Sequence, residues 1–192
     1  MFAVAAAGFG ATAHGIVPHR SPAPSLPRAD QPHDFPDLEA LLPPVVAGRA
    51  AELRSSFDGT VVADDETIYG GAYTALSLEL APSAGPDRLD ELEMAQEFLP
   101  GRGTSDWVSV TAYRYPGRTA AGWRPTLDAL VANRVPDAIW LFRRETIDGR
   151  QVVVGVDERG RPGDWIRLTR DVLVEVRGTD GPTVRAIISA LP

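Results

Sequence analysis

The side chains that most often carry out acid–base and metal chemistry are confined to the N-terminal part of this chain or missing from it. All three histidines, at positions 14, 19 and 33, precede the region expected to fold. The chain has no cysteine, which excludes thiolate nucleophiles, disulfides and cysteine-ligated metals. Histidine is the usual general base near neutral pH and the commonest metal ligand. We therefore expect no catalytic residue, metal or cofactor in the folded part.

Chemistry that uses carboxylates alone stays open, because paired Asp and Glu side chains suffice for some hydrolases. The densest acidic run is Asp64-Asp65-Glu66, which is typical of an exposed loop and could at most hold a hard cation weakly. Gly101-Arg102-Gly103 lacks the other glycines and the lysine of a phosphate-binding loop. A carboxylate-dependent hydrolase, with two acids converging in a pocket, is kept as an alternative function.

The composition fits one folded domain and disfavours a nucleic-acid partner. Of the 192 residues, 44% are hydrophobic and 23% charged, which is enough for a buried core. All 19 basic residues are arginine, and the net charge of −7 opposes binding to phosphates. Residues 37–100 carry a net −10 and residues 101–192 a net +3, so we expect the two halves to attract each other within the fold.

The first 36 residues are expected to lie outside the folded domain. Residues 1–17 form an apolar leader, and Ala11-Thr12-Ala13 fits the small-residue pattern of a signal-peptidase site, although no basic residue precedes the run. This predicts a truncated export signal or a membrane tether. Residues 18–36 contain six prolines, which is typical of an extended linker. The domain is therefore expected over residues 37–192.

Hydrophobic periodicity and turn residues divide the domain into helices and strands. Asp148-Gly149 is the strongest hairpin signal, and Arg170-Asp171 marks a second hairpin. The order implies an α+β domain in which an antiparallel sheet has its helices packed on one face. We expect helices over 37–42, 86–99, 119–134 and 182–191, and strands over 51–57, 73–80, 107–115, 139–146, 150–156, 165–169 and 172–177.

One face of this sheet is a candidate binding surface. Alternation along 107–115 places Trp107 and Tyr113 opposite the aliphatic side chains that would face the helices. We expect Trp165 and Arg167 to join them, with Ile166 and Leu168 facing the helices. Trp, Tyr and Arg are enriched at binding hot spots, and an antiparallel sheet often leaves one face in water. The alternative is that residues 45–80 cover this face.

Several short motifs lie along residues 38–192: Leu38–Pro43, Ser56–Gly59, Asp106 at the start of a strand, Ile147–Val152, Arg170–Leu173 and Ala190–Pro192. Together they resemble motifs of uncharacterised exported proteins from actinobacteria and related high-GC bacteria. The resemblance is thin, and it implies an envelope location and an α+β fold but no catalytic residues.

Together these observations predict an extracytoplasmic protein, secreted or tethered at the cell envelope, that acts as a non-catalytic binding module. Its expected partner is an envelope protein or a small ligand, bound through Trp107, Tyr113, Trp165 and Arg167. The alternatives are the hydrolase described above and a structural component of an envelope assembly.

Overall fold

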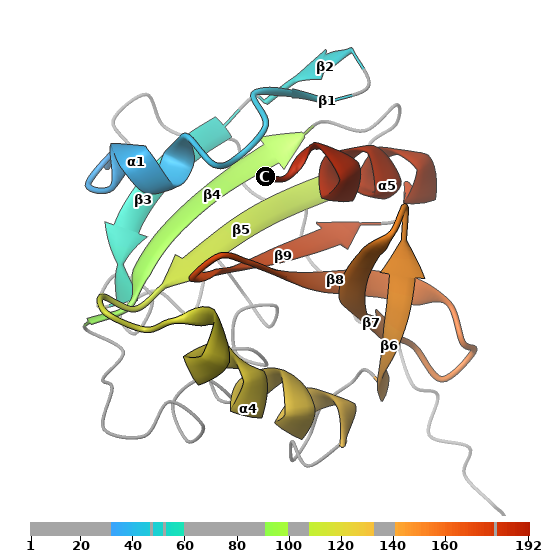
Figure 1. Ribbon diagram of the computed structural model, residues 1–192. Helices are drawn as coiled ribbons and strands as arrows, with labels where there is room; N and C mark the ends of the chain where they lie inside the picture. Colours follow the sequence, from blue (N-terminus) through green and yellow to red (C-terminus); the bar gives the residue numbers. More distant parts are fainter. Residues whose placement is uncertain are drawn as a thin grey trace, which may run out of the picture.

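A seven-stranded antiparallel sheet organises the protein (Figure 1). The computed structural model describes residues 32–46, 48–51, 53–59, 91–99, 108–132, 141–178 and 180–192. Within them the strand order is β3-β4-β5-β9-β8-β7-β6, and β1 and β2 form a separate two-stranded sheet. The predicted mixture of helices with an antiparallel sheet is confirmed.

The described elements follow in chain order. The helices are α1 (Pro36–Glu39), α4 (Ala120–Val131) and α5 (Gly181–Ala190). The strands are β1 (Val45–Val46), β2 (Arg49–Ala50), β3 (Leu53–Asp58), β4 (Glu93–Leu99), β5 (Val108–Arg114), β6 (Leu141–Ile147), β7 (Arg150–Val156), β8 (Pro162–Thr169) and β9 (Val172–Gly178). The strand predicted over 73–80 lies outside the described residues.

The two predicted hairpins are confirmed. Asp148 and Gly149 join β6 to β7 with φ angles of 49° and 77°, and positive φ at both residues is what a tight two-residue hairpin turn requires. Arg170 and Asp171 join β8 to β9. Local turn chemistry therefore fixes the register of four of the seven strands.

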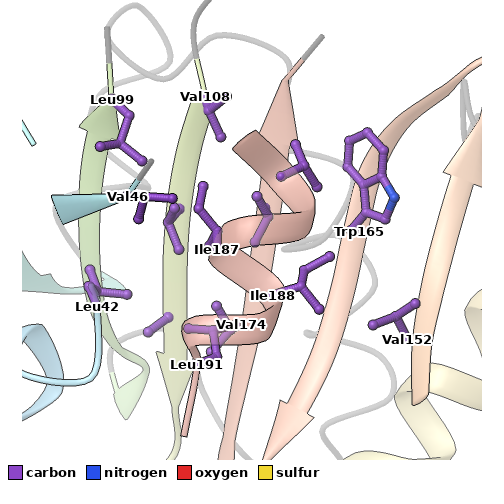
Figure 2. Close-up of a cluster of buried hydrophobic side chains, with 14 of the residues drawn as sticks. Leu42, Val46, Leu99, Val108, Val152, Trp165, Val174, Ile187, Ile188 and Leu191 are labelled. Atoms are coloured by element: carbon purple, nitrogen blue, oxygen red, sulfur yellow. The ribbon is translucent and has the colours of Figure 1, made fainter. Parts of the chain in front are cut away.

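Side chains that alternate along the strands form two hydrophobic clusters, one on each face of the sheet. One face, called here the α5 face, packs Ala112 and Val174 against Val184, Ile187 and Ile188 of α5 and also against α1 (Figures 1 and 2). The other, the α4 face, packs Tyr113, Ile166 and Leu173 against Trp123 and Leu127 of α4. The helices thus cover both faces, and the expectation that they gather on one face is wrong.

The helix expected over 86–99 is also wrong where the structure describes it. Residues 93–99 form β4, which pairs with β3 on one side and β5 on the other. Both faces of this strand are covered, so Met94 and Ala95 are equally buried and the sequence shows no clear alternation. Strand pairing on two sides overrides the helix propensity of Glu, Met, Ala and Gln.

The folded domain begins before Asp37, the residue expected as its start. The Ser56 N–H donates to the Pro32 carbonyl (2.9 Å) and the Asp34 N–H donates to the Ser56 carbonyl (3.1 Å). Residues 32–36, expected as linker, therefore lie along the edge of β3. His33 belongs to this segment, and its Nδ1 lies 2.8 Å from Oε1 of the buried Glu39. The expectation that the folded part holds no imidazole is wrong.

Candidate functional site

The four residues expected to form one binding face do not share a face. Trp107 lies outside the described residues. Tyr113 is 1% exposed and lies on the α4 face, where Leu173 pairs opposite it. Trp165 is 6% exposed and lies on the α5 face (Figure 2). Because neighbouring residues point to opposite faces, Arg167 lies on the α5 face with Trp165.

The expectation that Trp165 and Arg167 share a face of the sheet with Tyr113 is wrong. It could not be avoided from the sequence, because both faces of β8 are buried. Ile166 is as inaccessible as Trp165, so neither residue type reveals which face meets which helix. Arg167 donates from Nη1 to the carbonyls of Ile188 (3.1 Å) and Leu191 (2.9 Å). Burial and the neighbouring Arg150 lower the pKa of Arg167. A guanidinium at the carbonyl end of α5 stabilises the helix terminus.

A row of buried polar side chains crosses the α4 face beyond Tyr113. The Tyr113 hydroxyl donates to Oε2 of Glu175 (2.7 Å). Nε of Arg177 lies 3.9 Å from Oε1 of Glu175 and 4.0 Å from Oδ2 of Asp164. Catalytic carboxylates must face a substrate across open space, whereas these two face an arginine and are 3% exposed. They give the hydrolase alternative no support.

A small pocket opens on the α5 face at one end of the central strands. It has a volume of about 200 Å³. It is bounded by α1, the end of β5 and the β8–β9 turn, and its lining residues are Asp37, Leu41, Arg114, Thr169, Arg170, Asp171 and Val172.

Arg114 is fixed in the wall of this pocket by two carboxylates. Its Nη1 donates to Oδ2 of Asp37 (2.7 Å), and its Nε donates to Oε2 of Glu93, the residue opposite it on β4. The hydrogen bond from Arg114 holds the pKa of Asp37 below its ordinary value, and the hydrogen bond to Asp37 raises the pKa of Arg114. These contacts join α1 to the sheet at this wall of the pocket.

The lining of the pocket includes a buried hydroxyl group. Thr169 is 4% exposed, and its Oγ1 makes no hydrogen bond with the part of the chain that the structure describes. Leaving a buried polar atom unpaired costs about 1–3 kcal/mol. Because Thr169 lines the pocket, a rotation of its side chain toward the opening would let a bound molecule supply the missing hydrogen-bond partner.

The β8–β9 turn places two charges at the rim. Arg170 and Asp171 are exposed. Nε1 of Trp123 donates to the Asp171 carbonyl (2.7 Å), which ties the turn to α4. Arg170 has a φ of 54°, in the left-handed region that favours glycine.

Replacing Arg170 with glycine is expected to raise the free energy of unfolding by up to about 1 kcal/mol. The left-handed region costs a non-glycine residue roughly 1–2 kcal/mol, while glycine adds about 0.5–1 kcal/mol of unfolded-state entropy. Urea unfolding measures the change. Arg159→Gly, at an exposed turn residue without a positive φ, should lower stability. A loss in R170G would show that the Arg170 side chain stabilises the fold.

Residue types and spacing do not reveal this pocket, because its walls come from segments far apart in the sequence. Asp37, Arg114 and Arg170 share no motif, and the Arg170-Asp171 dipeptide predicts a hairpin turn and not a binding site. The one available signal was an arginine where a tight hairpin turn favours glycine or asparagine.

No protein-family model matches the chain, and neither do curated proteins or solved structures.

Proposed function

We propose that this protein is a non-catalytic binding module whose recognition site is the pocket beside the β8–β9 turn. The unpaired, buried hydroxyl of Thr169 carries the proposal. A polar atom that the fold buries without a partner is stabilised when a ligand completes its hydrogen bond. The site replaces the surface expected from Trp107, Tyr113, Trp165 and Arg167.

The pocket favours a small zwitterion of amino-acid size, such as a free amino acid or the end of a short peptide. Arg170 can face an anionic group and Asp171 a cationic one, and both lie at the rim. Leu41 and Val172 add apolar surface for a short side chain. A volume of about 200 Å³ is below the range of about 300–1,000 Å³ that larger ligands occupy.

An extracytoplasmic location belongs to the same proposal. It is supported by the apolar residues 2–17 and by Ala11-Thr12-Ala13 within this run. Among the described residues, no helix combines the length and the apolar character needed to cross a membrane. Recovery of the protein only from the cytosol after cell fractionation would contradict this location.

Replacing Thr169 with valine is expected to stabilise the fold and weaken ligand binding at the same time. The variant removes an unpaired buried hydroxyl, so the free energy of unfolding should rise by about 1 kcal/mol. Loss of one hydrogen bond to the ligand should raise Kd roughly threefold to tenfold. Urea unfolding gives the first quantity, and a titration of ¹⁵N-labelled protein with alanine and with dialanine gives the second.

The matched control is Thr183→Val. The Thr183 hydroxyl is also buried but donates to Oδ2 of Asp180 (2.7 Å), so this variant should lose about 1 kcal/mol and keep its affinity. Acetate and methylammonium, each carrying one of the two charges, should bind more weakly than alanine. The proposed function is wrong if no zwitterion shifts the amide resonances of residues 169–172 in a saturable way.

A further inference from the structure

Arg114, in the wall of the pocket, is held by two carboxylates that differ in how easily another anion could replace them. The Glu93 side chain is 18% exposed, and Glu93 pairs directly with Arg114 across β4 and β5. The Asp37 side chain is 66% exposed and lines the pocket. Exposed ion pairs contribute little to stability, because water competes for both charges. Asp37 is therefore the partner that a bound anion could replace at small cost.

Building on the function proposed for this pocket, we propose that Asp37 is a placeholder for the carboxylate of the ligand, which displaces it from Arg114. Nη1 of Arg114 donates to Oδ2 of Asp37 (2.7 Å), while Nε donates to Glu93. The exchange changes the partner of Nη1 and keeps the bond from Nε, so Glu93 holds the guanidinium in place. Because one carboxylate replaces another, the charge of Arg114 stays balanced.

Arg114 reaches the same end of the sheet as the β8–β9 turn. It follows Tyr113, which pairs with Leu173 on β9, and Arg170 lines the pocket with it. A carboxylate bound here can meet the Arg114 guanidinium from the sheet and the Arg170 guanidinium from the turn. The planar fork of a guanidinium can donate two parallel hydrogen bonds to a carboxylate, whereas Asp37 accepts one from Arg114.

Helix α1 does not depend on the contact between Asp37 and Arg114 alone. Leu38 is fully buried in the hydrophobic cluster on the α5 face, and Leu41 packs against the same cluster. We therefore expect α1 to stay on the sheet when Asp37 turns to solvent. A ligand without an acidic group leaves the ion pair intact and gains no partner from Arg114. The exchange thus selects ligands that carry a carboxylate.

Asp37→Asn tests the exchange in the full chain, because asparagine has the shape of aspartate but no charge. Acetate is the probe, titrated at constant ionic strength, and the amide resonances of residues 169–172 in ¹⁵N-labelled protein give its Kd. D37N should bind acetate about twofold to fivefold more tightly than wild type, since acetate no longer competes with a carboxylate. Asp37→Ser, which keeps an oxygen acceptor at the start of α1, should show the same gain. Acetamide, the uncharged analogue, should gain nothing from either substitution.

The matched control is Asp34→Asn. Asp34 is exposed, lies three residues before Asp37 and is not among the residues that line the pocket. D34N changes the net charge by the same amount and should leave the Kd of acetate unchanged.

The outcomes separate the exchange from the proposed function. If wild type binds alanine but D37N binds acetate no more tightly than wild type does, the placeholder role is overturned and the proposed function stands. Equal gains in D34N and D37N also overturn the placeholder role, because net charge alone would then explain them. If alanine does not shift the amide resonances of residues 169–172 in wild type, the proposed function is wrong and the exchange fails with it.

Discussion

Replacing Arg54 with methionine is expected to lower the free energy of unfolding by about 3 kcal/mol at pH 8 and by much less at pH 5. Nη2 of Arg54 donates to Oε2 of Glu97 (2.8 Å) and to the Leu42 carbonyl (3.1 Å). Glu97 is fully buried on β4, and its Oε1 has no hydrogen-bond partner in the described part of the chain. Without Arg54 the carboxylate would be a buried charge with no counterion, which is strongly destabilising.

The pH dependence follows from the raised pKa of Glu97. Burial raises this pKa from 4.5 to about 6, and Arg54 offsets only part of the effect. The folded state therefore binds a proton more tightly than the unfolded state. For wild type, the contribution of Glu97 is greatest below the unfolded pKa and falls by about 2 kcal/mol as the pH rises from about 4.5 through 6. Removing Arg54 raises the pKa further and deepens this fall.

Urea unfolding of wild type and R54M at pH 5, 6.5 and 8 measures the effect. Glu97→Gln removes the titrating group, so this variant should lack the fall between pH 4.5 and 6 and should be more stable than wild type at pH 8. In the E97Q background, R54M should cost the same at all three pH values. Arg161→Met, at the exposed ion pair with Asp157, should change stability by less than about 1 kcal/mol. Equal losses for R54M at pH 5 and pH 8 would contradict the assignment to Glu97.

The second half of the chain could be predicted because its determinants are local. A two-residue turn at Asp148-Gly149 admits few pairings of β6 with β7, and Pro116-Gly117 ends the segment that contains β5. The helix expected over 119–134 and the closing helix expected over 182–191 correspond to α4 and α5. In each case the signal lies within about ten residues of the element that it defines.

The faces of the strands could not be predicted, because a sheet covered on both sides does not separate polar from apolar residues. Glu97 on the α5 face and Glu175 on the α4 face are both buried and both charge-paired. Arg167 interacts with the carbonyl groups at the end of α5. In such strands an arginine or a tryptophan gives no information about which side is open.

The pocket lined by Thr169 depends on tertiary contacts even more than the faces of the strands do. Arg114 becomes a pocket wall only because Asp37 and Glu93 hold it from two other elements. Thr169 becomes notable only because its hydroxyl is buried without a partner. Neither fact has a counterpart in residue type or spacing, so the sequence alone does not reveal this pocket.

Replacing Trp123 with alanine is expected to cost about 3–5 kcal/mol of stability, the largest effect of any single substitution considered for this protein. Trp123 is fully buried between α4 and the sheet. The guanidinium carbon of Arg118 lies 4.7 Å from the ring centroids of both Trp123 and Tyr115, which adds cation–π attraction to the packing. Thermal and urea unfolding measure the loss.

Trp123→Phe separates packing from the hydrogen bond. Phenylalanine keeps most of the buried area but cannot donate to the Asp171 carbonyl, which the Trp123 indole does over 2.7 Å. We therefore expect W123F to lose about 1–2 kcal/mol, faster amide hydrogen exchange at residues 169–172, and weaker binding of zwitterions. Leu127→Ala, on the same face of α4, should lose about 2–4 kcal/mol of stability yet keep both the slow exchange and the affinity. If L127A and W123F changed the turn equally, α4 would act on the pocket through general packing and not through the indole.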